Sequence, residues 1–275
     1  MPILEALILG LVQGLTEYIP VSSTAHLLLV PWLLGWHYDA ETTFVFTILI
    51  QWGTLVGVVI YFWRDIWSMV RGVINGLIKR EPIGTPAARL GWWIVIATIP
   101  AVIFGLLLKN AVAVLYNQPV IIALILIAAA GLMIAAERFG KRTRQIDSMT
   151  AIDAGVIGLW QVLALFPGVS RSSATVSGGM LRHFERAEAA RFSFLMSIPA
   201  LLGAGVIAIK DLLEVKGLLA TLAAPLAVGF IVAAISGYAS IRWLLGYLKT
   251  RPLNVFTFYR LAFGLLIIIV ALSRG

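Results

Sequence analysis

The chain has 275 residues, of which 60% are hydrophobic and only 12% charged, a composition that excludes a soluble globular protein and predicts an integral membrane protein. It contains no cysteine, which excludes disulfides, thiolate nucleophiles and cysteine-based metal sites. The net charge of +8 does not indicate nucleic-acid binding, because most Lys and Arg residues lie in loops beside apolar segments, and membrane lipids are the expected surroundings.

The first apolar segment, residues 3–30, is interrupted near its middle by Pro20 and the polar run Ser22-Ser23-Thr24. Proline ends an α-helix, and serine is a good cap for the next one. We therefore expect a re-entrant segment, in which one helix enters the membrane, stops at a loop, and returns as a second short helix. Residues 151–181 form a second segment of this kind, interrupted at Pro167-Gly168.

Six other segments are apolar and about 20 residues long, the length that crosses a bilayer. They are residues 43–63, 90–108, 119–137, 191–209, 222–243 and 254–273. The sequence thus predicts an all-α integral membrane protein with six transmembrane helices and two re-entrant helix-loop-helix segments. We expect a single membrane domain over residues 1–275.

The two interrupted segments repeat one another at a constant offset of 148 residues. Gly10, Leu11, Gln13, Leu15, Val21 and Ser22 recur as Gly158, Leu159, Gln161, Leu163, Val169 and Ser170. Matching broken segments in the two halves of a membrane protein are typical of inverted repeats and indicate where the central site lies. We expect an inverted-topology repeat of residues 1–137 and 150–275, with both breaks near the midplane.

The positive charges predict the orientation of this arrangement. With the N-terminus outside and each interrupted segment re-entering its own side, 15 Lys and Arg residues fall in inner loops. The outer segments hold four: Lys109, Lys210, Lys216 and Arg274. This distribution satisfies the positive-inside rule, whereas two fully spanning interrupted segments would weaken the bias.

The first break carries an acid, a histidine and hydroxyls. Gln13 and Glu17 are four residues apart and share one helix face, and a carboxylate inside an apolar segment is usually functional. The polar residues that follow are Ser22, Ser23, Thr24 and His26. Such groups can position a nucleophile and transfer protons.

The second break has the character of an anion site. Ser170, Arg171 and Ser172 are expected at the start of the returning helix, where free N–H groups and the helix dipole favour an anion. Arg171 adds a planar set of donors suited to phosphate oxygens, and Thr175 lies one turn further on. Together the two breaks predict a site for phosphate chemistry. Arg260, inside the last apolar segment, is expected to be a structural partner rather than a phosphate contact.

At these residues the chain resembles the undecaprenyl-diphosphate phosphatase family, the bacterial bacitracin-resistance proteins. The family signatures are a Glu/Gln-x-x-x-Glu stretch that leads into Pro-x-Ser-Ser-Thr-x-His, and a Pro-Gly-x-Ser-Arg-Ser run. Residues 13–17, 20–26 and 167–172 match them, and the resemblance covers nearly the whole chain.

The resemblance implies an enzyme of the bacterial inner membrane that hydrolyses undecaprenyl diphosphate to undecaprenyl phosphate and phosphate. This reaction recycles the lipid carrier for peptidoglycan synthesis and confers bacitracin resistance. The resemblance also implies an active site open to the periplasm, a polyprenyl diphosphate substrate, a homodimer, and a response to Mg²⁺ or Ca²⁺. Gln13 is the less acidic of the two residues found at its position, which leaves Glu17 as the candidate metal ligand and the metal requirement open.

The expected mechanism leaves two choices open. Arg171, Ser170 and Ser172 hold the diphosphate together with loop N–H groups, and Gln13, Ser22, Thr24 and Thr175 extend this set. Either Ser23 or a water attacks the terminal phosphorus. His26 serves as base or acid, while Glu17 orients it, acts as base, or holds a cation.

The alternative function is that of a lipid-carrier flippase or a secondary transporter, since broken helices in inverted repeats are typical of transporters. Transport needs binding groups but no Ser-Ser-Thr-x-His run beside a glutamate. The sequence therefore favours hydrolysis.

Overall fold

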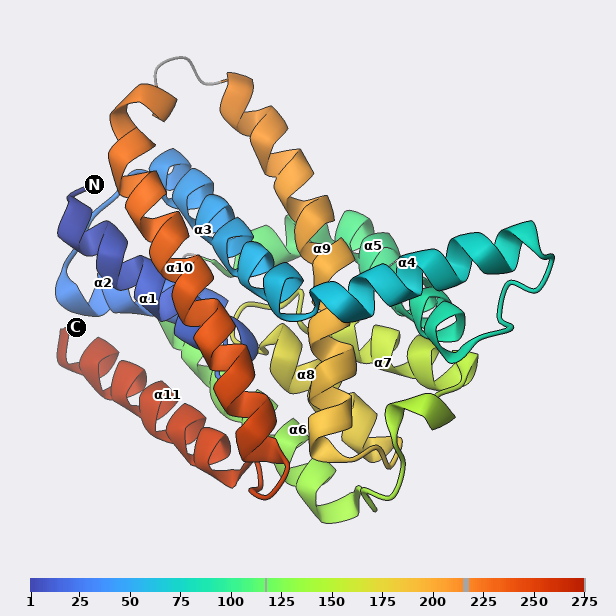
Figure 1. Ribbon diagram of the computed structural model, residues 1–275. Coiled ribbons are helices and arrows are strands. Elements are labelled where there is room, and N and C mark those ends of the chain that lie inside the picture. The colour runs from blue at the N-terminus through green and yellow to red at the C-terminus, as the bar shows by residue number, and fades with distance from the viewer. Residues whose placement is uncertain (117, 215–217, 275) are drawn as a thin grey trace.

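The computed structural model describes residues 1–116, 118–214 and 218–274, and these described residues form twelve helices, which confirms the all-α class (Figure 1). The helices are α1 (Ile3–Tyr18), α2 (Ser23–Leu34), α3 (Ala40–Tyr61), α4 (Trp63–Ile78), α5 (Pro86–Ala113), α6 (Pro119–Phe139), the 3-10 turn η1 (Ile146–Ser148), α7 (Ala151–Leu163), α8 (Arg171–Leu181), α9 (Arg186–Glu214), α10 (Leu218–Leu248) and α11 (Asn254–Arg274).

Among the described residues, five helices are long and apolar enough to cross a membrane, so the chain is a multi-pass membrane protein. The candidate spans are Thr42–Tyr61, Pro86–Leu108, Pro119–Phe139, Leu222–Leu248 and Asn254–Arg274, which confirm five of the six predicted segments. The sixth, residues 191–209, lies within α9, but the side chains of residues 204 and 207–209 are outside the described part. Lys216 and the side chains of Lys109 and Lys210 are outside it as well.

Both helix breaks occur where the sequence predicts them, and they share one backbone conformation. α1 ends at Tyr18 and α2 begins at Ser23, while α7 ends at Leu163 and α8 begins at Arg171. The residue before each second helix is a serine with positive φ, 77° at Ser22 and 73° at Ser170. Each serine side chain accepts a hydrogen bond from a backbone N–H three residues on and so caps its helix.

The first helix of each broken pair packs on a span from the other half of the chain. α1 lies against α10, and a Cβ atom added at Gly10 would come within 2.5 Å of the carbonyl oxygen of Gly229. α7 lies against α5, and a Cβ at Gly158 would come within 2.5 Å of the carbonyl oxygen of Ala97. Small residues that allow such close backbone approach are typical of helix packing in membranes.

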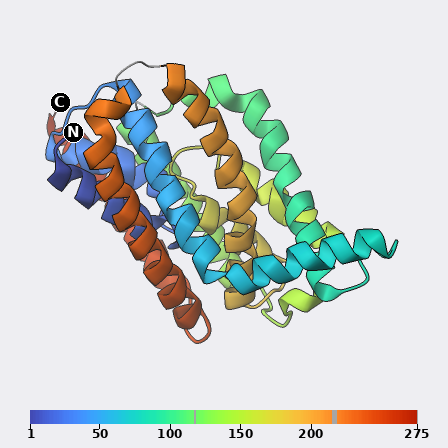
Figure 2. The ribbon, with the colours of Figure 1, turned by 45° about the horizontal axis from the view of Figure 1, so that its top comes forward.

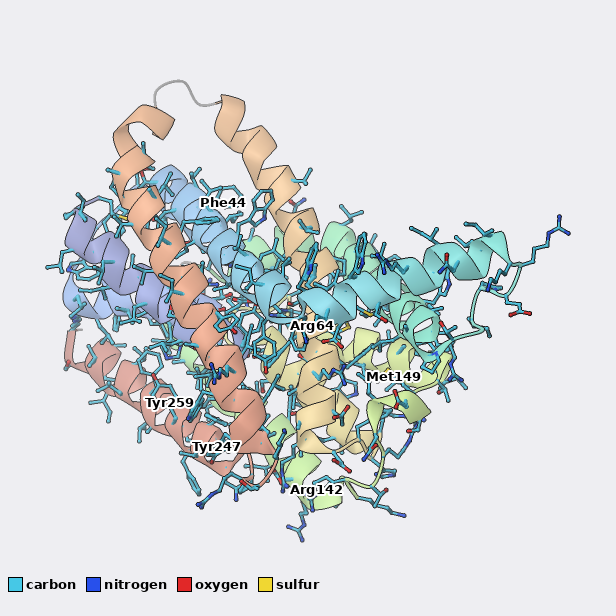
Figure 3. The ribbon with its side chains drawn as sticks, in the orientation of Figure 1. Phe44, Arg64, Arg142, Met149, Tyr247 and Tyr259 are labelled. Atoms are coloured by element: carbon cyan, nitrogen blue, oxygen red, sulfur yellow. The ribbon has the colours of Figure 1, made fainter. Side chains whose placement is uncertain are left out.

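Two carboxylates join the loops at one end of the bundle, the lower end in Figure 3, where Arg142 is labelled. The Asp153 carboxylate, at the loop end of α7, accepts hydrogen bonds from Arg144 at 2.7 Å and from Arg182 at 2.7 Å. Glu137, in the last turn of α6, accepts from Arg186, Arg142 and the backbone N–H of Leu253. These contacts connect α6, α7, α8, α9 and the start of α11.

α8 is enclosed by the rest of the bundle. Every residue from Ser172 to Met180 is buried, and the helix contacts α6, α7 and α9. α8 carries three serines and a threonine, and their burial shows that the helix is surrounded by protein and does not face lipid. The burial of α8 therefore places the second break in the interior of the protein.

Candidate functional site

The two helix breaks meet through an ion pair. Nη2 of Arg171, the first residue of α8, lies 2.9 Å from Oε1 of Glu17 in the last turn of α1. Only 13% of the arginine side chain and 6% of the glutamate side chain are exposed. Charges this far from water are stable only when they are paired and hydrogen-bonded. The ion pair therefore holds the two breaks together, although its residues are 154 positions apart in the sequence.

The second oxygen of Glu17 bonds two more polar side chains from the first broken segment. Oε2 accepts a hydrogen bond from the hydroxyl of Ser23 at 2.8 Å and another from Nε2 of Gln13 at 2.9 Å. The structure thus brings together four of the predicted site residues, Gln13, Glu17, Ser23 and Arg171, around one carboxylate.

Arg171 is held in place from α9 and α1. Its Nη1 donates to the carbonyl oxygen of Ser193 at 3.1 Å, and its guanidinium lies 6.0 Å from the ring centre of Tyr18. The predicted residue Thr175 supports this arrangement, because its hydroxyl donates to the carbonyl of Arg171 and meets the hydroxyl of Ser193 at 2.6 Å. Thr175 therefore positions the arginine.

Three further residues of the site were not identified from the sequence: Tyr18, Thr54 and Ser193. The hydroxyl of Tyr18 donates to the carbonyl of Thr54 at 2.8 Å, and Nε2 of Gln13 lies 3.4 Å from the hydroxyl of Thr54. Thr54 lies in α3 and Ser193 lies in α9, and both helices carry several other polar residues. No local sequence pattern therefore distinguishes these two residues as part of the site.

The remaining hydroxyls of the breaks lie in the turns themselves. The Ser170 hydroxyl accepts from the N–H of Ser173 and lies 3.1 Å from the hydroxyl of Ser172. The hydroxyl of Ser172 is 3.5 Å from the carbonyl oxygen of Ile19, so the second break touches the first. Ser22 caps α2, and Thr24 is partly buried in its first turn.

His26 faces away from the carboxylate cluster, toward α11. Its Nδ1 lies 2.8 Å from the carbonyl oxygen of Ser22, its Nε2 lies 2.7 Å from the hydroxyl of Tyr259, and its ring stacks on Phe263. Within the described residues neither nitrogen is bonded to Ser23, whose hydroxyl donates to Glu17 instead. In this structure the Ser23 hydroxyl is thus bonded to Glu17, while His26 is bonded to Ser22 and Tyr259.

Arg260, in α11, contacts both helix breaks. Its side chain is fully buried and donates to the carbonyl oxygens of Pro20 at 3.4 Å, Gly168 at 2.8 Å and Leu126 at 3.2 Å. Pro20 and Gly168 are equivalent positions in the 148-residue repeat. The arginine contacts backbone carbonyls, as its expected structural role requires.

The donor set suits a hard cation only in part. Among the described residues, no three or more His, Asp or Glu side chains gather as a metal cluster would. Glu17 is the single carboxylate of the site, and Oε1 of Gln13 is a buried oxygen without a hydrogen-bond partner. Mg²⁺ is commonly held by one or two carboxylates together with substrate phosphates, so these oxygens fit a cation that arrives with a phosphorylated substrate.

A cavity of about 310 Å³ lies beside α2 and is separate from this cluster. Its walls include Leu27, Trp32, Phe46 and Ile122, and none of the four residues around the Glu17 carboxylate lines it. The cavity is therefore distinct from the cluster around Glu17, and its aromatic and aliphatic walls are adjacent to the helix that carries Ser23.

Fold and site together define a class: a polytopic helical membrane protein with a buried carboxylate, arginine and serine gathered at two helix breaks. The chain belongs to the family of the bacitracin resistance protein BacA, whose sequence profile matches residues 6–266. The family resemblance read from the motifs is thereby confirmed.

Several curated relatives are similar over almost their full length. The undecaprenyl-diphosphatase of Myxococcus xanthus (strain DK1622) is 44% identical over 270 residues, which cover 98% of this chain and 89% of the relative. The undecaprenyl-diphosphatase of Chlorobaculum tepidum is 42% identical, with coverage of 98% and 97%. That of Chlorobium limicola is 45% identical, with coverage of 96% and 95%.

Proposed function

We propose that this protein hydrolyses the terminal phosphate of undecaprenyl diphosphate, giving undecaprenyl phosphate and inorganic phosphate. The observation that carries the proposal is the carboxylate of Glu17, which bonds a hydroxyl nucleophile, Ser23, on one oxygen and a cationic phosphate ligand, Arg171, on the other. The name of the similar proteins, undecaprenyl-diphosphatase, supports the same substrate. This reaction would recycle the lipid carrier for peptidoglycan synthesis and confer bacitracin resistance.

Arg171 binds the diphosphate together with the first N–H groups of α8. A guanidinium has five N–H donors, and the bonds to Glu17 and to the Ser193 carbonyl engage two of them. The others are available for phosphate oxygens. The dipole of α8 adds to the attraction, because the helix begins at Arg171 itself.

Ser23 is the nucleophile in this proposal, and Glu17 is its base. The hydroxyl oxygen of Ser23 forms a bond to the terminal phosphorus while its proton passes to Oε2 of Glu17, 2.8 Å away. The anhydride P–O bond breaks, undecaprenyl phosphate leaves, and a water then cleaves the phosphoserine to release phosphate. Arg171 stabilises the negative charge that develops on the transferring phosphoryl group.

His26 acts as a positioning residue rather than as the base. It holds the carbonyl of Ser22, the residue with positive φ that precedes Ser23, and it is fixed in turn by the hydroxyl of Tyr259. A base at this position would need to reach the Ser23 hydroxyl, which is already bonded to Glu17.

Glu17 and Oε1 of Gln13 are the oxygens that would hold Mg²⁺ or Ca²⁺ beside the substrate phosphates. A bound cation would neutralise phosphate charge.

We also propose that each broken helix pair is re-entrant, in an inverted repeat of residues 1–137 and 150–275 within a single membrane domain. The equal backbone conformation at Ser22 and Ser170 supports the repeat. The distribution of Lys and Arg supports the proposed orientation, with the N-terminus outside, and the family resemblance implies a site open to the periplasmic side of the inner membrane. Because the chain has no cysteine, single cysteines introduced in each loop and labelled from one side test the topology. Sedimentation in detergent tests the homodimer implied by the family.

The deciding experiment measures phosphate release from undecaprenyl diphosphate by purified protein in detergent, with and without EDTA. We expect Glu17→Gln and Arg171→Gln each to lower the rate by about 100-fold or more. Glu81→Gln, a change to an exposed loop carboxylate, is the matched control and should keep full activity. A well-folded wild-type protein that releases no phosphate under any metal condition would overturn the proposal.

Ser23→Ala separates the two nucleophiles. A phosphoenzyme trapped on Ser23 would support the serine as nucleophile, and full activity of Ser23→Ala would refute it and favour direct attack by water.

A flippase remains the second candidate, because the close contacts α1–α10 and α7–α5 are equivalent and suggest two related halves. Movement of labelled undecaprenyl phosphate across proteoliposomes, without phosphate release, would favour it.

A further inference from the structure

α4 leaves the bundle sideways at the point where a membrane span ends. α3 ends at Tyr61 and α4 begins at Trp63, next to Arg64, which is labelled in Figure 3. Figure 2 shows α4 lying across the ends of α3 and α5 instead of continuing along either helix. α4 connects the end of one candidate span to the start of the next, so both of its ends lie at the same membrane boundary. Its 16 residues are about 24 Å long.

The surface of α4 divides into three stripes along the helix. One stripe is partly or fully buried and packs on α5: Ile66, Met69, Gly72, Val73 and Gly76. A second stripe is apolar and exposed: Trp63, Trp67, Val70, Ile74, Leu77 and Ile78. A third is polar and exposed: Arg64, Ser68, Arg71, Asn75 and, just past the helix, Lys79. At 3.6 residues per turn the three stripes are spaced about evenly around the helix.

The apolar stripe has the composition of a membrane boundary. Trp63 and Trp67 stack with ring centres 6.1 Å apart, and the guanidinium of Arg71 lies 4.6 Å from the ring centre of Trp67. Tryptophan is enriched where hydrocarbon meets headgroups. Ile74 and Ile78 are 51% and 75% exposed, and aliphatic side chains beside these rings need an apolar neighbour.

The polar stripe is positively charged. Arg64, Arg71 and Lys79 are exposed, and Arg80 follows in the loop. The one acidic residue of the helix, Asp65, is paired with Arg191 of α9 and so does not neutralise them. A basic amphipathic helix with tryptophans on its apolar face is typical of segments that lie in the plane of an anionic membrane surface.

We propose that α4 is an interfacial helix that binds anionic phospholipids. Its apolar stripe is inserted at the boundary of the hydrocarbon, its basic stripe contacts lipid phosphates, and its buried stripe fixes it to α5. The occupant of the apolar stripe is therefore lipid. This inference does not depend on the proposed phosphatase activity, since none of its residues belongs to the Glu17–Arg171 site.

Depth measurements test the position of the helix. Single cysteines replace Ile74 and Asn75, neighbours on the apolar and polar stripes, and carry nitroxide labels in vesicles of phosphatidylcholine and phosphatidylglycerol. We expect the label at position 74 to be relaxed by oxygen and shielded from an aqueous nickel reagent, and the label at 75 to show the reverse. Equal aqueous access at both positions would overturn the proposal, as would spin–spin broadening at 74 from a second copy.

A second measurement tests whether the basic stripe of α4 selects anionic lipid. A fluorophore on Ile74→Cys is quenched by brominated phosphatidylglycerol or by brominated phosphatidylcholine, and the ratio gives the preference for anionic lipid. We expect Arg64→Gln and Arg71→Gln each to lower this preference, by up to about fivefold. Arg251→Gln, a change to an exposed arginine in another loop, is the control and should leave it unchanged. A preference that survives the double change would refute the binding of anionic lipid by α4.

Discussion

At the scale of single residues, Arg260 determines how the two helix breaks are held together. It is a fully buried cation whose hydrogen-bond partners are the carbonyls of Pro20, Gly168 and Leu126. The carbonyls of Pro20 and Gly168 lie in the breaks between helices, where the backbone cannot satisfy all of its own groups, whereas the carbonyl of Leu126 lies within α6. A side chain with five donors supplies bonds that a neutral residue cannot.

Replacing Arg260 with leucine should destabilise the protein by about 2–4 kcal/mol, because it leaves buried carbonyl groups unpaired. Thermal unfolding in detergent measures the loss. Arg274→Leu is the matched control: this arginine of the same helix also donates to backbone carbonyls, of Trp32 and Leu33, but it is exposed. An equal loss in both variants would contradict the role given to Arg260.

Gln13 determines how strongly the site depends on a cation. Its amide donates to Glu17 at 2.9 Å, so a carboxylate in its place would put two like charges side by side. We expect Gln13→Glu to make phosphate release more sensitive to EDTA than in the wild-type protein. A titration with Mg²⁺ after chelation measures the change, and an unaltered response would show that the residue at position 13 does not influence a metal.

At the scale of helices, the close contact of α7 with α5 depends on the absence of a side chain at Gly158. Alanine there would place its Cβ 2.5 Å from the carbonyl oxygen of Ala97 and force the helices apart, at a cost of about 1–3 kcal/mol. A Cβ added at Gly155 of the same helix would meet no atom within 4 Å beyond that helix's own backbone, so Gly155→Ala should not destabilise the protein. The thermal midpoints of the two variants test this contrast, and equal midpoints would contradict it.

The helix breaks could be predicted from sequence because their causes are local. Pro20, Pro167-Gly168 and a capping serine act within a few residues of their own position. The orientation of His26 could not be predicted, since it is set by Tyr259 and Phe263, more than 230 positions away. α4 was also missed: its Lys and Arg residues were counted as loop charges, although they form one stripe of a helix.

At the scale of the whole molecule, the Asp153 cluster makes stability depend on pH. Burial alone would raise the pKa of the Asp153 carboxyl, but hydrogen bonds from Arg144, Arg182 and Thr150 outweigh it and hold the pKa well below its ordinary value of 3.8. A carboxyl whose pKa is lowered by folding stabilises the fold above its unfolded pKa. That contribution is lost as the pH falls below about 4.

We therefore expect the thermal midpoint to drop between about pH 5 and about pH 3, and to drop less in Asp153→Asn, which lacks the titrating group. At neutral pH the same variant should be less stable than the wild type by about 2–4 kcal/mol, because Arg144 and Arg182 lose their shared partner. Parallel pH profiles for the two proteins would contradict the assignment.

The ion pair of the two breaks also sets an order of events during synthesis. Glu17 emerges from the ribosome 154 residues before Arg171, and α1 emerges well before α10, the helix on which it packs. For most of translation the first broken segment holds a carboxylate with no cation to neutralise it and a glycine face with nothing to cover it. The nascent chain must therefore keep this segment close to water or to the insertion machinery until the second half arrives, so the site is completed only near the end of translation.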